Sequence, residues 1–528
     1  MRLIIRRIVL PALLLAMAVP VFSQSEYWVF FKDKKGVEFD PYEYFDAKAI
    51  ARRIRNNVPL NDVSDRPLNK EYVRRVSELS DSVTGRTRWF NALAVMAGDE
   101  ALAVIKALPF VSRVEPVAVR ELAFCSDKKT ATSTFKTNWA NRQLKIMGYD
   151  SYKKAGIDGK GVRIAIFDGG FPGVNTVEAF KTIRDEGRLI KTWDFTKNRE
   201  NVFYSIAHGT MVMSNVGGML IKDGDTVRYG MATGAEFLLA KTEIRREPFS
   251  EEKNWLMAVE WADKNGADII NSSLGYGKER YFRTDMDGKT SLVSRAANMA
   301  ARKGILVVNS AGNEASNSWK KLITPADADS VLAVGGIDYY EDYHISFSSY
   351  GPTADGRMKP NVCALGNTLV ANKKDGESLV SGTSFSSPLV AGFAACALQA
   401  NPGIKTMDLF RLIEKSGHLY PYFDYAHGYG VPQASYILTK EKKKKDKNFS
   451  VKLKDERLYF NVFDADNIPG TYSLMYINLQ NKNGTLAYYE VVKVGQNKFR
   501  IYVNLSAYPD VDRINIYYKG YIETVKIP

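Results

Sequence analysis

Short apolar runs recur between residues 161 and about 438, and they constrain the fold more than any other feature of the chain. They lie at residues 162–167, 237–240, 267–270, 305–308 and 331–334. Strands with so few polar positions are typical of parallel sheets that are covered on both faces. Helical patterns lie between them, at residues 255–264 and 292–302. This alternation predicts an α/β domain, a doubly wound and mainly parallel sheet, from residue 161 to about residue 438.

Two further segments flank this domain. Residues 24–125 carry strand patterns at 27–31, 89–97 and 111–117 and helical patterns at 44–56 and 99–108, which predict a small α+β unit. Residues 449–528 show short alternating runs separated by turn residues, which predict an antiparallel β-sandwich. The polar segment 126–139 and the lysine-rich segment 439–448 have the composition of linkers.

The N-terminus has the three parts of a secretory signal peptide. Arg2, Arg6 and Arg7 precede the apolar run 8–19, and compact residues stand before Gln24. We therefore predict that residues 1–23 are removed and that the protein is exported, to the extracellular space, the cell surface or the periplasm. The run is too short for a comfortable membrane span, and no later segment is long and apolar enough, so we expect no transmembrane segment after signal removal.

The formal net charge of +14 does not by itself indicate a nucleic-acid partner. The clearest basic cluster, residues 440–447, has no aromatic residues among its lysines, so we interpret it as a solvated linker and expect no nucleic acid partner. The chain has three cysteines, Cys125, Cys363 and Cys396. An odd number in an exported protein argues against a disulfide framework, although one disulfide remains an alternative. The apolar surroundings of Cys363 and Cys396 predict buried thiols.

Ser384 is the first candidate for chemistry. It lies in the stretch 381–388, Ser-Gly-Thr-Ser-Phe-Ser-Ser-Pro, directly before an apolar run at 389–398 that predicts a buried helix. Gly382 permits a sharp turn, and Pro388 is expected in the first turn of the helix. Free backbone N–H groups at a helix start favour negative charge, so Ser384 could act as a nucleophile there. The alternative is an ordinary N-cap serine.

Three more candidates stand where ligands gather in open α/β sheets. Asp168 follows the run 162–167, His208 opens an apolar pattern at 211–220, and Asn313 follows the run 305–308. Each has a plain alternative: a turn aspartate, a structural histidine and a turn asparagine. Of the other histidines, His427 also precedes a glycine, but no helix follows it, so it is the weaker candidate for a base.

Taken together, these stretches resemble the motifs of the subtilisin-like serine peptidases. The matching segments are Phe-Asp-Gly-Gly at 167–170, His-Gly-Thr at 208–210, Ser-Leu-Gly at 273–275, Ala-Gly-Asn at 311–313 and Gly-Thr-Ser-Phe-Ser-Ser-Pro at 382–388. The order Asp, His, Ser is also that of the family. The resemblance covers residues 140 to 438. Two departures, Gly169 in place of a hydroxyl residue and Leu365 in place of proline, leave the candidate side chains unchanged.

The resemblance implies a function and a role for each residue. Ser384 would be the nucleophile, His208 the base, Asp168 its partner and Asn313 a donor to the oxyanion. Ser273, Leu274 and Gly275, together with Ser310, Ala311 and Gly312, would flank a protein or peptide substrate and form the walls of its first specificity pocket. Glu314, close to that pocket, could favour a basic side chain. The segment 27–117 resembles a propeptide, which could act as an intramolecular inhibitor.

No cofactor is expected. Calcium binding stays open, because no segment matches the usual calcium loop of the family, so no metal site is assigned.

Three alternative functions compete with the serine peptidase. A sedolisin-type acid peptidase would need a glutamate base and would show an acidic pH optimum; His208 and Asn313 argue against it. An α/β-hydrolase would need a Gly-x-Ser-x-Gly motif, which the chain lacks. An exported binding or adhesion protein on a dead peptidase scaffold would need no active residues, yet all four positions hold them.

Overall fold

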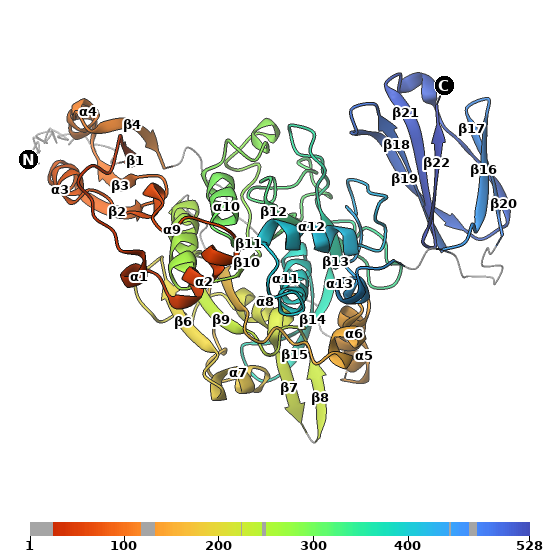
Figure 1. Ribbon diagram of the computed structural model, residues 1–528, viewed down its shortest axis with the longest axis horizontal. Helices are drawn as coiled ribbons and strands as arrows, with labels where there is room; N and C mark the ends of the chain where they lie inside the picture. Colours follow the sequence, from red (N-terminus) through yellow and green to blue (C-terminus); the bar gives the residue numbers. More distant parts are fainter. Residues whose placement is uncertain are drawn as a thin grey trace, which may run out of the picture.

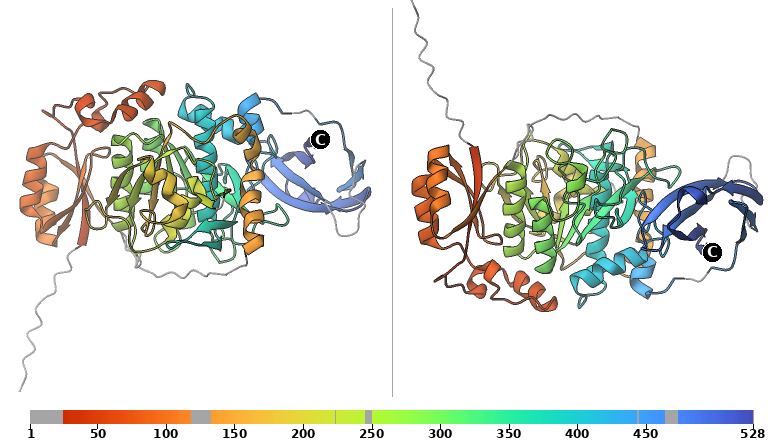
Figure 2. Two further views of the ribbon diagram at one scale, coloured as in Figure 1. Left: turned by 90° about the horizontal axis from the view of Figure 1, so that it is seen from below. Right: turned by 90° about the horizontal axis from the view of Figure 1, so that it is seen from above.

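The computed structural model describes residues 25–117, 133–222, 224–244, 250–442, 445–463 and 473–527. An N-terminal domain and a C-terminal domain lie at opposite ends of a central α/β domain (Figures 1 and 2). The predicted signal peptide at 1–23, Cys125 and the linker up to residue 132 lie outside the described residues.

The central sheet has seven strands, and all neighbouring strands are parallel, in the order β13-β12-β11-β10-β5-β9-β6. The predicted doubly wound fold is therefore confirmed. After β5 the chain forms β6 and β9, which extend the sheet from β5 toward one edge. It then forms β10 on the other side of β5 and extends the sheet toward the opposite edge, so the strand order reverses beside β5. Ligands bind at such a point, outside the carboxyl ends of the strands. The strands are β5 Arg163–Asp168, β6 Leu189–Asp194, β9 Glu236–Lys241, β10 Ile269–Ser272, β11 Leu306–Ser310, β12 Val331–Ile337 and β13 Val362–Leu365.

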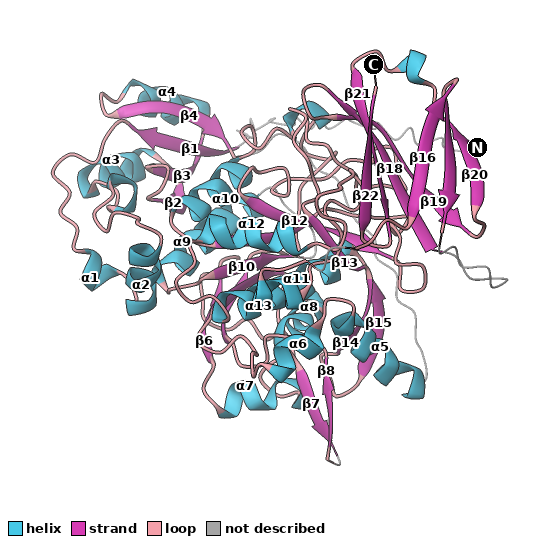
Figure 3. Ribbon diagram, turned by 45° about the vertical axis from the view of Figure 1, so that its right-hand side comes forward, coloured by secondary structure: helices cyan, strands magenta, loops and turns pink. Residues whose placement is uncertain are grey.

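Alternate residues of these strands enter two different cores. Ile164 and Ile166 of β5 pack with α8 (His208–Gly217) and α11 (Thr383–Gln399). Ala165 and Phe167 pack on the opposite face with α9 (Ser250–Lys264) and α10 (Leu292–Arg302). Helices cover both faces of the sheet (Figure 3), which explains why its strands are almost wholly apolar. The remaining helices of this domain are α5 Ser133–Lys145, α6 Tyr149–Lys154, α7 Lys181–Asp185, α12 Thr406–Ser416 and α13 Ala434–Thr439.

The predicted helical pattern at 211–220 is too long. Helix α8 ends at Gly217, and Gly218 is already extended, with φ −68° and ψ 140°. The chain then forms the hairpin of β7 (Met219–Lys222) and β8 (Asp225–Arg228). A Cβ at Gly217 would lie 2.5 Å from the carbonyl oxygen of Ala232, so this turn can pass its neighbour only as glycine. A second hairpin, β14 (Asn367–Ala371) with β15 (Glu377–Ser381), leads into α11.

The N-terminal domain is an antiparallel sheet in the order β2-β3-β1-β4. Helices α3 (Lys70–Leu79) and α4 (Asp99–Ala107) accompany one face, and the other face packs its Trp28 and Phe30 into the same core as α9. The predicted strand 89–97 is shorter, because the chain turns at Asn91, where φ is +53°. The strands are β1 Ser25–Phe31, β2 Ser82–Thr87, β3 Ala92–Ala97 and β4 Val111–Pro116.

An arm of this domain, residues 41–65, reaches the amino ends of the parallel strands. It consists of α1 (Pro41–Tyr44), α2 (Ala47–Arg55) and the short turn η1 (Val63–Asp65). The Arg52 guanidinium donates to the carbonyl oxygen of Ala267, just before β10, at 2.5 Å. The arm therefore lies at the edge of the sheet opposite to the carboxyl ends of the strands.

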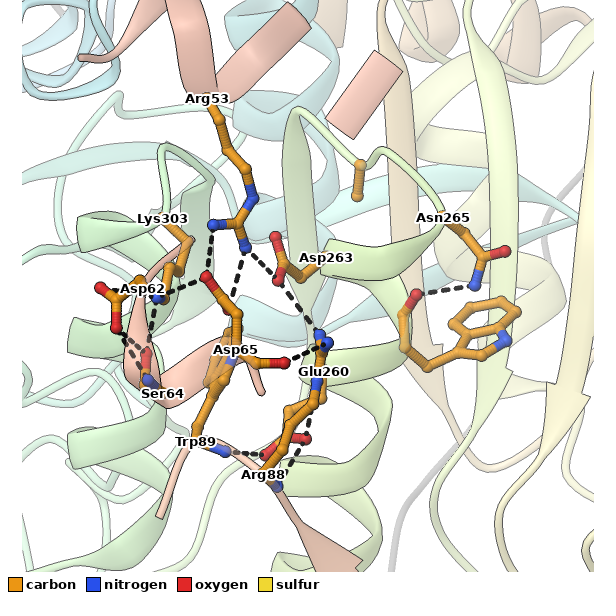
Figure 4. Close-up of polar contacts among 12 residues, drawn as sticks. Arg53, Asp62, Ser64, Asp65, Arg88, Trp89, Glu260, Asp263, Asn265 and Lys303 are labelled. Atoms are coloured by element: carbon orange, nitrogen blue, oxygen red, sulfur yellow. Dashed lines mark hydrogen bonds and ion pairs between the residues drawn. The ribbon is translucent and has the colours of Figure 1, made fainter. Parts of the chain in front are cut away.

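Fully buried charges join the arm to α9 and α10 (Figure 4). The Arg53 guanidinium bridges Asp65 of the arm at 2.7 Å and Asp263 of α9 at 2.6 Å. Arg52 also pairs with Asp263, and the Lys303 ammonium lies 2.9 Å from Asp65. Each charge has an opposite partner within hydrogen-bonding distance, which is the condition under which burial of charges is tolerated.

The C-terminal domain is the predicted β-sandwich. Its sheets have the orders β16-β17-β20 and β19-β18-β21-β22, and both contribute to one apolar core. Leu419 and Tyr422 of the central domain pack against Tyr476 and Tyr517 of the sandwich. The last two strands were not predicted. The strands are β16 Phe449–Lys454, β17 Arg457–Val462, β18 Ser473–Asn481, β19 Leu486–Val494, β20 Lys498–Tyr502, β21 Val511–Tyr518 and β22 Tyr521–Lys526.

Cys363 and Cys396 are buried free thiols, as predicted. Within the described ranges, no helix has both the length and the apolar character needed to cross a bilayer. Over the same residues, no group of three or more His, Cys, Asp or Glu side chains is placed to hold a metal ion.

We predict that Arg53→Ala lowers the free energy of unfolding by about 3 kcal/mol, because it removes a fully buried cation that contacts both Asp65 and Asp263. Asp65 then keeps Lys303, and Asp263 keeps Arg52, as a charged partner. Arg74 of α3 is a matched control, since it also pairs with two carboxylates, Glu71 and Glu78, but its side chain is 55% exposed. Arg74→Ala should cost no more than about 1 kcal/mol. Urea unfolding of the full chain, followed by tryptophan fluorescence, measures both. Equal losses would contradict the assigned importance of the buried network.

Candidate active site

Asp168 and His208 form a carboxylate–imidazole pair at the carboxyl edge of the sheet. Asp168 is the last residue of β5 and is 1% exposed. Its Oδ2 lies 2.8 Å from Nδ1 of His208, the first residue of α8, and its Oδ1 accepts from the backbone N–H of Gly169 at 2.7 Å. A Cβ at Gly209 would lie 2.8 Å from Cβ of Asp168, so the glycine after the histidine lets α8 approach the strand end.

The Asp168 carboxylate raises the pKa of His208. Burial lowers the pKa of the His208 imidazole, but the Asp168 carboxylate outweighs burial through its charge and its hydrogen bond, so the pKa lies above its usual value of 6.5. Because Nδ1 faces the carboxylate, a neutral His208 carries its proton on Nδ1 and leaves Nε2 as the basic nitrogen. The side chain is 27% exposed, so the pair is not sealed from solvent.

Ser384 lies in the first turn of α11, as predicted. The N-cap is Gly382, with φ +147°, so Ser384 is not an N-cap serine. The first N–H groups of a helix have no intrahelical acceptor, and that of Ser384 is one of them. The N–H of Thr383 donates to the Asn313 side chain, and that of Phe385 donates to the carbonyl oxygen of Gly382. The N–H of Ser384 itself remains available at the positive end of a buried helix of 17 residues.

The predicted place of Pro388 in the first turn is wrong. Helix α11 begins at Thr383, so Pro388 lies inside it. A proline has no N–H to donate to the carbonyl four residues earlier, which here belongs to Ser384. That carbonyl instead accepts a hydrogen bond from Oγ of Ser273 at 2.7 Å. The proline thus leaves the Ser384 carbonyl without a helical donor, and Ser273, in the segment after β10, binds that carbonyl instead.

Asn313 is held by Thr383. Its Oδ1 accepts from both the backbone N–H and the hydroxyl of Thr383, each at 2.9 Å. A backbone N–H can only donate, so the amide oxygen faces Thr383 and the NH₂ group must point the other way. Nδ2 lies over Gly382, where an added Cβ would be 3.5 Å away. Thr383, which the sequence analysis did not single out, therefore orients Asn313; its place between Gly382 and Ser384 is the only signal in the sequence.

The structure brings the predicted residues to one edge of the sheet but does not join all of them. Oγ of Ser384 donates to the carbonyl oxygen of Ser273 at 3.2 Å rather than to His208. The ring of Phe385, the next residue, lies 5.4 Å from the His208 ring, centroid to centroid. Among the described residues, no hydrogen bond joins Ser384 to His208.

The predicted substrate-binding segments leave the carboxyl ends of two neighbouring strands. Ser273, Leu274 and Gly275 follow β10, and Ser310, Ala311 and Gly312 end and follow β11. Gly312 has φ +107°, which a residue with a side chain rarely adopts. Its N–H donates to the Thr383 hydroxyl at 3.3 Å, so this segment is tied to the start of α11.

His427, the weaker candidate for a base, lies elsewhere and is engaged at both ring nitrogens. Nδ1 is 3.0 Å from both carboxylate oxygens of Asp424, and Nε2 accepts from the backbone N–H of His344 at 2.9 Å. The ring is 2% exposed. This is the geometry of a structural histidine.

Two protein families match the chain. Residues 159–430 match the subtilase family, and residues 26–141 match the family described as the peptidase S8 propeptide domain of Bacteroidota. The second match includes the whole N-terminal domain, with its buried arm.

The names of individual relatives agree with the match to the subtilase family. A thermophilic serine proteinase from Bacillus sp. strain AK1 is 32% identical over 44% of this chain and 52% of its own length, and subtilisin DY from Bacillus licheniformis is 29% identical over 54% and 94%. Serine protease AprX from Bacillus subtilis is 28% identical over 49% and 62%. The match thus spans less than two thirds of two of these three relatives. The crystal structure of fervidolysin from Fervidobacterium pennivorans, with a TM-score of 0.55 and 18% identity over 94% of this chain and 71% of that one, shares the fold.

We predict that His208 titrates above pH 6.5 and that Asp168→Asn lowers its pKa, because only the opposing effect of burial then remains. His344 and His418 are internal controls, since burial lowers the pKa of each to about 4. NMR titration of protein labelled at the histidine Cε1 carbons measures all of them at once. A wild-type pKa for His208 at or below 6.5, or no decrease in the variant, would contradict the proposed electrostatic balance.

Proposed function

The chain belongs to the subtilase family, and from this premise we propose that it is an exported serine endopeptidase that cleaves protein or peptide substrates through an acyl-enzyme. The single observation that carries the proposal is the hydrogen-bonded Asp168–His208 pair, at the same edge of the sheet as a serine in the first turn of a helix. A carboxylate, an imidazole and a helix-start hydroxyl are the parts of a serine-peptidase triad.

In the proposed first step, the Ser384 hydroxyl attacks the carbonyl carbon of the scissile bond while Nε2 of His208 takes its proton. The resulting imidazolium is stabilised by Asp168, which remains ionised. His208 then returns the proton to the leaving amine, the C–N bond breaks, and the acyl group stays on Ser384. Water, activated by the same imidazole, releases the acid and regenerates the serine.

We propose that the backbone N–H of Ser384 and Nδ2 of Asn313 stabilise the negative oxygen of the tetrahedral intermediate. Both donors are held in advance: the N–H by the helix start and the amide by its two bonds from Thr383. Donors that need no reorganisation during the reaction are worth most in catalysis. The segments 273–275 and 310–312 would bind the substrate main chain as neighbouring strands, a mode that tolerates many sequences.

The competing functions fit these residues less well. A sedolisin-type enzyme needs a carboxylate base, whereas here an imidazole faces the carboxylate and an asparagine stands beside the serine. A dead scaffold that serves as an exported binding protein would have no need to hold Asn313 by two hydrogen bonds or to keep the Ser384 N–H free. Because the base must be neutral, we expect activity to fall as the pH decreases through the raised pKa of His208.

We further propose that the N-terminal domain is a propeptide that assists folding and blocks the peptidase until it is cut. Its sheet packs against α9, and its arm supplies three of the five charges of the buried network, Arg52, Arg53 and Asp65. A parallel sheet has many contacts between distant parts of the chain and folds slowly, so a bound template helps it form. Export, directed by residues 1–23, would keep the active enzyme away from the cytoplasm.

We predict that Ser384→Ala and His208→Ala each lower kcat/KM for peptide hydrolysis by about 10⁴-fold or more, since each removes a group that acts in every turnover. His427→Ala is the matched control and should retain activity per folded molecule. The rates are measured on a quenched peptide library, with circular dichroism to check folding. Full activity of a folded Ser384→Ala variant, or loss only in His427→Ala, would overturn the assignment.

We predict that the wild-type protein acquires a new N-terminus between residues 117 and 139, whereas Ser384→Ala keeps Gln24 at its N-terminus. The reason is that the cut is made by the peptidase itself within the polar linker. N-terminal sequencing of both secreted proteins, beside a His427→Ala control that should still be cut, decides the matter. Active wild-type protein that retains Gln24 would rule out the propeptide.

A further inference from the structure

The segments that follow β10 and β11 flank Ser384, and the space between them is called the gap. On one side, the carbonyl oxygen of Ser273 accepts from Oγ of Ser384. On the other, Asn313 binds the residue before Ser384. A substrate carbonyl that reaches both Oγ of Ser384 and Nδ2 of Asn313 must place its own residue's side chain between these two segments. Glycines at 275, 277 and 312 leave the gap without side chains from its own walls.

Ile323 crosses the far end of this gap. Its backbone N–H donates to the carbonyl oxygen of Ala311 at 3.2 Å. The next residue, Thr324, exchanges two hydrogen bonds with Tyr276, at 2.9 and 3.1 Å. The segment 323–324 therefore binds to both walls and forms a floor between them.

The Ile323 side chain fills the space that the three glycines open. A Cβ at Gly275 would lie 2.5 Å from Cδ1 of Ile323, one at Gly277 would lie 2.6 Å from Cγ2, and one at Gly312 would lie 3.0 Å from Cγ1. These values are shorter than van der Waals contact, so the isoleucine already touches the glycine backbones on both walls.

Packing on its other side limits how far the Ile323 side chain can move out of the gap. Behind it lies a close-packed cluster that includes Trp319 and Leu322, of which Trp319 is 5% and Leu322 0% exposed. Close-packed interiors yield little when a larger group is forced into them. The depth available to an entering side chain is therefore set by Ile323.

The one acidic side chain of the segment 310–314, Glu314, is engaged within its own turn. The Glu314 carboxylate accepts a hydrogen bond from Nδ2 of Asn317, within its own turn, and the Glu314 N–H donates to Oγ of Ser349 at 3.0 Å. The groups that meet at the floor are the isoleucine methyls and glycine backbone.

We propose that Ile323 makes this pocket shallow and apolar, so that the enzyme cleaves after residues with small uncharged side chains, such as alanine, and rejects phenylalanine, leucine and lysine. The inference rests on the proposed serine-peptidase function and names the substrate class of the same site. Ile323 determines specificity by occupying the space that a larger side chain would need.

The test uses the full secreted chain and a series of tetrapeptide p-nitroanilides that differ only in the residue before the scissile bond. The wild-type protein should give a kcat/KM for alanine at least about tenfold above that for phenylalanine, since pocket contacts of this kind discriminate by about 10–200-fold. Ile323→Ala should raise the phenylalanine-to-alanine ratio by about tenfold or more. Ile323→Val, a milder change for the case in which the alanine variant does not fold, should raise the ratio in the same direction.

Ile157→Ala is the matched control: Ile157 is also a partly buried isoleucine, but it lies near the C-terminal end of α11, next to Asp158, which binds Gln399. This variant should leave the ratio unchanged. A serine-directed fluorophosphonate counts active sites in every sample. If no protein is labelled and no substrate is cut, the proposed function fails. If the protein is labelled and cuts after phenylalanine as well as after alanine, or if neither Ile323 variant changes the ratio, the inference about Ile323 is overturned.

Discussion

The close contact between α8 and α11 determines where the candidate catalytic residues His208 and Ser384 can lie. A Cβ at Gly392 of α11 would lie 2.7 Å from the carbonyl oxygen of Val216 in α8, so any other residue would force the two helices apart. His208 begins one of these helices and Ser384 lies in the first turn of the other. Their separation is thus set by a helix–helix contact deep in the core, two turns or more below the site, and the packing of a protein interior makes such a spacing rigid.

The stabilising and the reactive parts of the sheet occupy opposite edges. The carboxyl ends of β5, β10 and β11 carry Asp168, Ser273 and Ser310, whereas the amino ends are covered by the arm of the N-terminal domain (Figure 1). The arm contributes buried charges, and removing one of them is costly because it takes a close partner away from another buried charge. A domain attached at the amino edge and along α9 can support the folded sheet without contacting the candidate site residues at the carboxyl edge.

Contacts between different segments also hold the surroundings of Ser384 in place. Pro388 leaves the Ser384 carbonyl without its helical donor, and Ser273 supplies another. Thr383 holds Asn313 by its backbone and its hydroxyl together, while Ile323 bridges the two segments beside it. Together these contacts join the start of α11, the segment after β10 and the segment after β11 into one surface, which is the condition for donors and acceptors that are in place before a substrate binds.

The sequence by itself determined the central fold and the identity of the candidate side chains, because buried parallel strands must be apolar and their carboxyl ends must share an edge. It could not determine how those side chains are held. The edge strand β6 lacks a clear apolar pattern, since its Ile190 and Lys191 are exposed. The late strand β21 does alternate, with Ile514, Ile516 and Tyr518 buried in the sandwich core, so the sequence held a signal there that the prediction did not use. Arg52, Arg53 and Asp263 look like ordinary surface charges along the chain and are buried only because distant segments meet. The position of Ile323 beneath three glycines was likewise decided by the tertiary structure alone, since those residues are brought together by strand packing and not by any local pattern.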